Sequence, residues 1–224
     1  MLETISRTSL NETVFEKLKS SIINNVLKPG EKLTVESLSK KLGVSRTPVS
    51  NALQALEKDG YIVILPQNGT YVRELTSEEL AVIYDLREVI EGLVAKLIIK
   101  NINREKLSQY LKSFHEFLEY DSYDEDIIER FYSLELEFHD YLVSACPYII
   151  KNEIRNIVDL TKRSRKLLLQ HEVSVSISTV IKDKDIKLHM QLIESLLCGD
   201  VETAENIAKQ DVRDTKTEVL KYFY

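Results

Sequence analysis

The 224-residue chain contains few cysteines and no long apolar run. Its two cysteines, Cys146 and Cys198, form no CxxC pair, which excludes a disulfide scaffold, a zinc ribbon and a redox pair of that spacing. No stretch approaches 18 consecutive apolar residues, and residues 1–4 lack the basic and then apolar pattern of a secretory signal. We therefore expect a cytoplasmic protein that makes no contact with a membrane.

Repeats and a common nucleophile motif are also missing. The G-x-S-x-G motif does not occur, and neither does an internal repeat or a low-complexity segment. Hydrophobic residues make up 43% of the chain and charged residues 29%, which are the proportions of a globular protein with a core. The length fits two modest domains better than one.

Positive charge is scarce in the chain as a whole. The formal net charge is −6, which by itself argues against nucleic acid because phosphate binding depends on Lys and Arg. The charge is unevenly distributed, however, since residues 1–75 contain 10 basic and 8 acidic residues, whereas residues 76–224 contain 20 and 28. This asymmetry favours a binding module in residues 1–75 joined to an acidic body in residues 76–224.

The first predicted helix starts at a capping box. Ser9 can cap the helix while Glu12 reaches back to it. Apolar residues then recur at helical spacing and predict one buried face, made of Val14, Leu18, Ile22 and Val26. Pro29 and Gly30 end the helix.

Two further helices are predicted on either side of a three-residue turn. Thr34 can cap the first, and Gly43 suits the left-handed residue that follows it. The second begins at residues 45–48, with Pro48 in its first turn, and Gly60 closes it. This is the helix-turn-helix arrangement, whose second helix can enter the major groove of DNA. Its solvent face carries side chains that can bond bases or phosphates, namely Arg46, Thr47, Ser50, Asn51 and Gln54.

Residues 61–72 predict a β-hairpin that forms a wing. The first strand is Tyr61–Leu65, the turn is Pro66–Gly69 with an Asn-Gly pair at its end, and the second strand is Thr70–Val72. The predicted fold of residues 1–75 is therefore a winged helix-turn-helix of the α+β class. This geometry alone leaves two alternatives open, a DNA-binding module and a small helical domain with another role.

Several runs agree in register with one family pattern, at residues 28–35, 42–49, 52–53, 56–57, 60 and 68–72. They resemble the GntR family of bacterial transcription regulators over residues 9–74. The resemblance implies a homodimer that binds double-stranded operator DNA. We expect DNA contacts from eight residues, Thr34, Ser45, Arg46, Thr47, Ser50, Asn51, Asn68 and Gly69. Ser50-Asn51 stands where the family usually has Arg-Glu, which predicts a changed operator sequence, with Arg46 left to carry the base contact.

Residues 76–224 predict an all-α bundle of about six helices. A capping box at Thr76–Glu79 opens the first, whose apolar face is Leu80, Ile83, Leu86, Ile90, Val94 and Leu97. The second runs from about residue 103 to 120, and the acidic stretch 121–126 separates it from the third. The last three are predicted at about 147–170, 183–198 and 201–222.

Four ionisable residues lie within or beside apolar stripes of this bundle. Glu135 and His139 are four apart on the third helix, a spacing that one metal ion can bridge, and His189 and Asp211 lie on the fifth and sixth. Four such groups aimed at one interior are costly to bury unless they are paired or coordinated. Each residue taken alone is also compatible with a hydrogen-bonded core or rim position, so the spacing leaves both interpretations open.

A second resemblance bears on this choice. An acid four residues before the His of a Phe-His pair, as in Glu135 and Phe138-His139, and His189 followed by Gly199-Asp200 and Ala204, are similar to the FadR-like branch of GntR regulators. That branch has a C-terminal ligand-binding domain called FCD. The resemblance implies a divalent metal, zinc, manganese or nickel, which holds the carboxylate of a small organic acid. The implied ligands are Glu135, His139, His189 and Asp211.

The implied ligand set departs from the family at two positions. Glu135 stands where Asp is commoner, and Asp211 stands where His is commoner. The site then has two nitrogen donors, from the histidines, and two oxygen donors, from the carboxylates. This set weakens the preference for zinc relative to manganese or iron. Arg87 and Glu91 match the family's Arg-x-x-x-Glu, so Arg87 either clamps an effector carboxylate or pairs with Glu91 on the same helix.

The sequence thus predicts a transcriptional regulator, a repressor by the resemblance, whose operator affinity is controlled by a small carboxylate effector. Two alternatives remain open. One is the same class of regulator with a metal-free effector pocket, since some members of the branch bind no metal. The other is a metal-dependent enzyme, which is disfavoured because an operator-binding domain has no ready role in catalysis. We expect no enzymatic activity.

Overall fold

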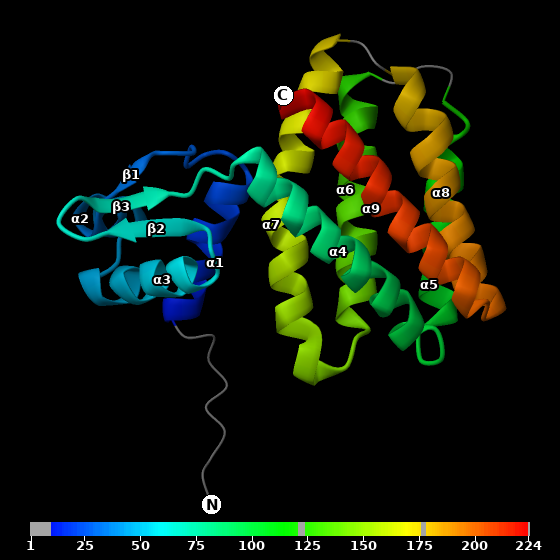
Figure 1. Ribbon diagram of the computed structural model, residues 1–224, viewed down its shortest axis with the longest axis horizontal. Helices are drawn as coiled ribbons and strands as arrows, with labels where there is room; N and C mark the ends of the chain where they lie inside the picture. Colours follow the sequence, from blue (N-terminus) through cyan, green and yellow to red (C-terminus); the bar gives the residue numbers. More distant parts are fainter. Residues whose placement is uncertain (1–9, 121–123, 176–177, 224) are drawn as a thin grey trace, which may run out of the picture. The chain divides into compact units, whose positions relative to one another are not determined.

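The computed structural model describes residues 10–120, 124–175 and 178–223 (Figure 1). The chain separates into two compact units, Met1–Thr76 and Ser77–Tyr224. Within the described residues, no helix combines the length and the apolar character that crossing a membrane requires. The predicted cap at Ser9 and part of the acidic stretch, residues 121–123, lie outside the described residues.

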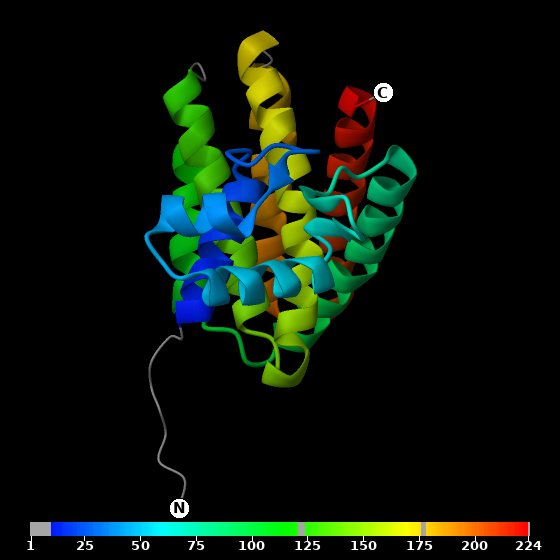
Figure 2. The ribbon, with the colours of Figure 1, turned by 90° about the vertical axis from the view of Figure 1, so that its left-hand side faces the viewer.

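The N-terminal unit is a winged helix-turn-helix, as predicted. Figure 2 turns this unit toward the viewer, with its helices and its small sheet. Its helices are α1 (Leu10–Ile23), α2 (Val35–Leu42) and α3 (Arg46–Lys58), and its strands are β1 (Lys32–Leu33), β2 (Ile62–Leu65) and β3 (Gly69–Val72). The strands form one antiparallel sheet in the order β1-β3-β2. The core of the unit comes from the inner faces of the helices and strands, and includes Leu18, Leu38, Val49, Leu56 and Val72.

The end of α1 differs from the prediction. The helix stops at Ile23, and Asn25 takes the left-handed conformation with φ 57°. Asn tolerates that conformation better than most residues, so it can end a helix without glycine. The chain then turns, Val26 is 70% exposed, and Leu27 is buried in its place. The prediction that Val26 continues the buried face was therefore wrong.

The sheet also differs in detail from the predicted hairpin. Strand β1, which pairs with β3 through Lys32 and Tyr71, was not predicted because two residues carry no periodic signal. The hairpin itself forms, but its turn centres on Pro66 and Gln67, and the Leu65 carbonyl accepts a hydrogen bond from the amide of Asn68. Proline fixes the backbone angle of the first central residue, which outweighs the Asn-Gly signal two positions later.

The C-terminal unit contains six helices within the described residues, in agreement with the predicted bundle. They are α4 (Ser77–Ile98), α5 (Arg104–Phe117), α6 (Glu125–Ser144), α7 (Tyr148–Val175), α8 (Ser178–Cys198) and α9 (Val201–Phe223). Helices α4 and α9 pack along each other, as do α5 with α8 and α6 with α7 (Figure 1). Helix α7 ends at Val175 and α8 begins at Ser178, whereas the prediction ended the first at about residue 170 and began the second at about residue 183. Asn103 and Asp124 cap α5 and α6 through their side chains.

The buried face of α4 was predicted incorrectly in part. The buried line includes Tyr84, Arg87 and Glu91, whereas Leu86 is 47% exposed. Periodicity places charged residues outside, but Arg87 and Glu91 pair with each other and can therefore be buried. The opposite face of α4 consequently carries four exposed apolar side chains, which we call the α4 stripe: Val82, Leu86, Val89 and Leu93.

Candidate metal centre and DNA-contact surface

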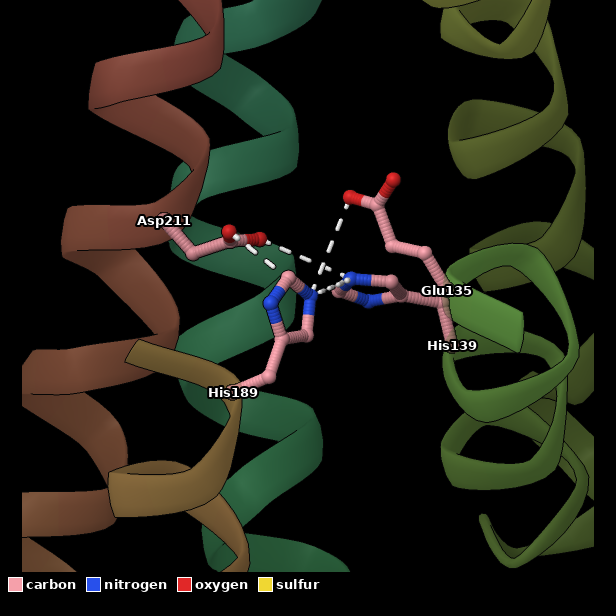
Figure 3. Close-up of side chains that lie close together, drawn as sticks. All are labelled: Glu135, His139, His189 and Asp211. Carbon is pink, nitrogen blue, oxygen red and sulfur yellow. Dashed lines mark hydrogen bonds and ion pairs between the residues drawn. The ribbon is translucent and has the colours of Figure 1, made fainter. Parts of the chain in front are cut away.

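Three helices of the C-terminal unit bring the four predicted metal ligands together (Figure 3). Helix α6 supplies Glu135 and His139, α8 supplies His189, and α9 supplies Asp211. All four residues are buried, and one ligand atom from each lies within 4.8 Å of the others. Glu135 and His139, one turn apart on α6, therefore face residues that are fifty or more positions away in the sequence.

The distances within the cluster suit one divalent ion. The two Nε2 atoms of His139 and His189 are 3.2 Å apart. Asp211 Oδ2 lies 3.5 Å from His139 Nε2, and Glu135 Oε1 lies 3.7 Å from His189 Nε2. Metal to nitrogen and metal to oxygen bonds of about 2.1 Å around one ion place neighbouring donors about 3 to 4 Å apart.

The two imidazoles are held with their Nε2 atoms toward the centre of the cluster. His189 Nδ1 donates to the backbone carbonyl of Asp185 at 2.6 Å, which leaves the lone pair on Nε2. The His189 ring also stacks on Phe114 of α5, with the ring centroids 5.0 Å apart. On the outer side of His139, Nδ1 lies 3.7 Å from Glu91 Oε1, a carboxylate placed as an outer partner of a histidine ligand.

Electrostatics favour the ligand form of these groups. Burial lowers the pKa of His189 to about 4, although the nearby Asp211 carboxylate acts in the opposite direction. Asp211 has a lowered pKa because the two histidines and two arginines around it outweigh its burial. A neutral imidazole and an ionised carboxylate are the forms that bind a metal.

Two carboxylate oxygens of the cluster lack ordinary hydrogen bonds. Glu135 Oε1 and Asp211 Oδ2 are buried and accept none, although Glu135 Oε1 has an ion-pair partner in Arg165. Buried acceptors are nearly always satisfied in folded proteins, and since Glu135 Oε1 has Arg165, Asp211 Oδ2 is the oxygen of the cluster that needs a partner. The residues present therefore fit a divalent cation, which Glu135, His139, His189 and Asp211 would hold.

The predicted DNA contacts cluster at the start of α3. Ser45, Arg46, Thr47 and Asn51 are exposed there, and Ser50 is half-buried. Ser45 stands at the capping position but its side chain makes no capping bond. Arg46 Nη2 lies 3.9 Å from Glu36 Oε2, and both side chains are largely exposed. Such surface pairs contribute little, so the guanidinium can leave Glu36 for another acceptor.

Three predicted contacts also serve the fold of the N-terminal unit. Thr34 Oγ1 accepts the amide of Ser37 at 3.2 Å and so caps α2. Asn68 Oδ1 accepts the Tyr71 hydroxyl at 2.9 Å at the wing tip. Gly69 has φ 133°, an angle that side chains disfavour, and therefore tolerates substitution poorly.

Residues 10–72 match the family described as bacterial regulatory proteins, gntR family, and residues 82–214 match the FCD domain. The chain belongs to the GntR family. The uncharacterized HTH-type transcriptional regulator YdhC of Bacillus subtilis is 31% identical over 150 residues, which cover 65% of this chain and 65% of YdhC. The HTH-type transcriptional repressor RspR of Escherichia coli is 23% identical, covering 94% of this chain and 89% of RspR.

Further comparisons support the same family and fold. The gluconate operon transcriptional repressor of Bacillus subtilis is 27% identical, covering 84% of this GntR chain and 82% of the repressor. Among solved structures, E. coli McbR/YncC superimposes with a TM-score of 0.77 at 20% identity, over 97% of this chain and 100% of that one. A transcriptional regulator from Rhodococcus sp. RHA1 gives 0.62 at 20% identity, over 97% and 100%. These likenesses show the fold.

Arg87 of this GntR-family chain pairs inside the FCD domain. Its Nε and Nη2 donate to Glu91 Oε1 at 3.2 and 3.1 Å, and its Nη1 donates to Thr161 at 2.8 Å. Burial raises the pKa of Glu91, but His139 and Arg87 outweigh it and hold that pKa at about 2. Of the two predicted roles, the pairing with Glu91 is present in this structure, and the effector contact of Arg87 stays a prediction.

The sequence reasoning missed the residues that α7 contributes to the FCD interior. Arg165 is buried beside Glu135, and Ser164 shares a hydrogen bond of 3.0 Å with the Tyr84 hydroxyl. A signal was available, because Ile154, Val158 and Arg165 lie on one face of a helix at spacings of four and seven. A basic residue within a buried stripe indicates a charged partner in the interior.

Proposed function

We propose that the chain is a DNA-binding transcriptional repressor whose operator affinity is controlled by a small organic acid held in the FCD domain. The observation that carries the proposal is the exposed polar start of α3, with Arg46, Thr47 and Asn51, on a winged helix of the GntR family. The names of two relatives, RspR and the gluconate operon repressor, support repression as the outcome.

DNA reading rests on α3 and the wing. In this proposal Arg46 bonds a guanine edge, a contact worth about 1–3 kcal/mol of base discrimination. The side chains of Thr47, Ser50 and Asn51 reach bases or phosphates. Ser45 and Thr34 lie at the N-terminal ends of α3 and α2, where backbone amides also bind phosphate. Gly69 and Asn68 at the wing tip let the backbone approach the duplex closely.

A divalent metal, zinc, manganese or nickel, is the proposed cofactor of the FCD domain. Glu135, His139, His189 and Asp211 would hold it, and it would supply a positive centre that attracts the carboxylate of the effector. With two oxygen and two nitrogen donors the set is harder than an all-histidine site, so manganese is favoured more than in such a site. The effector acts by preferring one arrangement of the two units, which changes the affinity for DNA.

The α4 stripe supports a homodimer. Val82, Leu86, Val89 and Leu93 are each 44–66% exposed and follow one face of the helix at spacings of four, three and four. The acidic neighbours Asp85 and Glu88 pair with α9 of the same chain, which leaves the stripe apolar. We propose a second copy as its occupant, because helix-turn-helix regulators read paired half-sites and α4 starts directly after the DNA-binding unit.

Mobility shift with DNA from the region upstream of the protein's own gene tests the proposal. Binding at low salt that weakens when a carboxylate effector is added supports it. Absence of any shift at low salt, with folded protein, contradicts it. Elemental analysis of untagged protein separates the metal site from the alternative of a metal-free pocket. Bound metal supports the first, and no bound metal together with no thermal shift on adding Mn²⁺, Zn²⁺ or Ni²⁺ supports the second.

A further inference from the structure

Arg165 of α7 lies beside an oxygen of Glu135, one of the four residues of the candidate metal centre. Its guanidinium contacts Glu135 Oε1 directly. Figure 3 shows this Glu135 carboxylate facing the His189 imidazole. Arg165 and Glu135 are both buried. A carboxylate oxygen in this position has two competing cations, one supplied by the chain and one from solution.

The charges around the cluster explain why Arg165 is needed before a metal arrives. Three buried carboxylates, Glu91, Glu135 and Asp211, lie near two buried guanidinium groups, Arg87 and Arg165. With neutral imidazoles these five groups carry one net negative charge. Arg87 is committed to Glu91 and Thr161, so Arg165 is the cation that balances Glu135. Removing a buried partner leaves an uncompensated charge and is strongly unfavourable.

We propose that a divalent metal displaces Arg165 from Glu135, and that the freed guanidinium then binds a carboxylate group of the effector. This inference rests on the metal and the organic acid of the proposed function. With a divalent cation added, the same groups carry one net positive charge, which a monocarboxylate neutralises. Arginine suits this role because its planar fork can bond both oxygens of a carboxylate. Metal binding thus creates the positive site that the effector requires.

The first test measures metal affinity with Mn²⁺ alone. Isothermal titration of the full-length untagged protein compares wild type with Arg165→Gln and with Arg155→Gln, a matched change on the same helix. Because Arg165 competes with the metal, Arg165→Gln binds Mn²⁺ more tightly, by about tenfold, which corresponds to about 1.4 kcal/mol. Arg155→Gln binds like wild type.

Other outcomes of this titration are distinguishable. If wild type binds Mn²⁺ and Arg165→Gln binds it equally or more weakly, Arg165 merely positions Glu135 and the inference is wrong while the metal site stands. If neither protein binds Mn²⁺, Zn²⁺ or Ni²⁺, the metal part of the proposed function fails and the inference fails with it.

The second test uses acetate as the simplest carboxylate. Line broadening of the acetate proton signal by the Mn²⁺-loaded protein reports its binding, and Arg165→Gln weakens that binding severalfold while Arg155→Gln does not. The same substitution then strengthens Mn²⁺ binding and weakens acetate binding. A purely structural role of Arg165 does not produce these two opposite effects. Unchanged acetate affinity in Arg165→Gln overturns the inference.

Folding of the variants is checked by thermal unfolding. Metal-free Arg165→Gln unfolds at a lower temperature than wild type. Adding Mn²⁺ raises the melting temperature of this variant by more than it raises that of wild type. If Arg165→Gln does not fold without metal, Arg165→Lys keeps the charge but loses the planar fork. It then binds Mn²⁺ about as wild type does and acetate more weakly, whereas wild-type acetate affinity in this variant contradicts the inference.

Discussion

His189 is an imidazole that the fold keeps neutral. Its pKa is lowered to about 4 from an ordinary value of 6.5, chiefly by burial, with His139 and Arg165 acting in the same direction and Asp211 against them. Glu135 Oε1 also faces its Nε2 at 3.7 Å. A folded state that excludes a proton from this ring becomes less stable wherever the unfolded chain can take that proton up.

The metal-free protein should therefore lose stability as the pH falls. Between pH 6.5 and 4 the unfolded chain protonates His189 and the folded chain does not, so the free energy of unfolding falls by about 3 kcal/mol across this window. Urea unfolding in the presence of a chelator at pH 7, 6 and 5 measures the effect. His189→Gln removes most of the slope, and a wild-type stability that is flat over this range would refute the assignment.

Arg46 is the residue on which base recognition depends in our proposal. Arg46→Ala lowers operator affinity by about 10- to 100-fold per half-site, because a guanine contact worth about 1–3 kcal/mol is lost. Fluorescence anisotropy at fixed salt measures the loss, and the circular dichroism melt stays unchanged because Arg46 is exposed. Lys58→Ala, at the other end of α3, is the matched control. Equal affinities for the two variants would remove Arg46 from the recognition surface.

The candidate metal centre could be predicted from the sequence only in part. Spacing and family resemblance named Glu135, His139, His189 and Asp211, which the structure brings together, because each is a polar residue in or beside an apolar stripe. Arg165 carried the same signal and was not recognised. Its partner Glu135 lies thirty residues away on another helix, and only tertiary packing brings the two together.

At the scale of elements, the sequence predicts what is long and periodic. The winged helix-turn-helix and the six-helix bundle are confirmed because caps, turns and apolar periods agree in each helix. Strand β1 was not predicted because its two residues are identified as a strand only by their pairing with β3. The inner face of α4 was misassigned because a buried Arg87–Glu91 pair inverts the usual rule of polar outside and apolar inside.

The exposed apolar face of α4 leads to a prediction about assembly. In the proposed dimer Val89→Glu places a charge in the middle of the α4 stripe, and the expected result is a monomer at micromolar concentration, because burying an unpaired carboxylate is costly. Sedimentation velocity measures the change. Ile149→Glu is the control, since Ile149 is 88% exposed at the start of α7 and lies outside the stripe. Equal dimer populations in the two variants would show that the interface lies outside the α4 stripe.

At the scale of the whole molecule, the chain is divided into two compact units. The N-terminal unit packs its own helices and sheet, and the C-terminal unit encloses the proposed metal centre. A ligand that binds only the folded state stabilises it, by about 2.7 kcal/mol at a concentration 100 times its dissociation constant. Metal should therefore stabilise one unit and leave the other unchanged.

Removal of metal should lower one of two unfolding transitions. Calorimetry of protein treated with a chelator shows the C-terminal transition at a lower temperature than in protein saturated with Mn²⁺, while the N-terminal transition stays in place. His139→Ala together with His189→Ala abolishes the difference because both nitrogen donors are lost. A metal-dependent shift that persists in this double variant would place the ion elsewhere.

Helix α4 serves three purposes at interleaved positions. Its first residue follows the DNA-binding unit, its inner face holds Arg87 and Glu91 beside the cluster, and its outer face carries the α4 stripe. Point mutations can alter one face and spare the other two. The gain or loss of one codon between Ser77 and Arg87 would instead rotate the two ends of the helix against each other by about 100°. A substitution in α4 therefore acts on one face at a time, whereas a change in its length disturbs all three positions together.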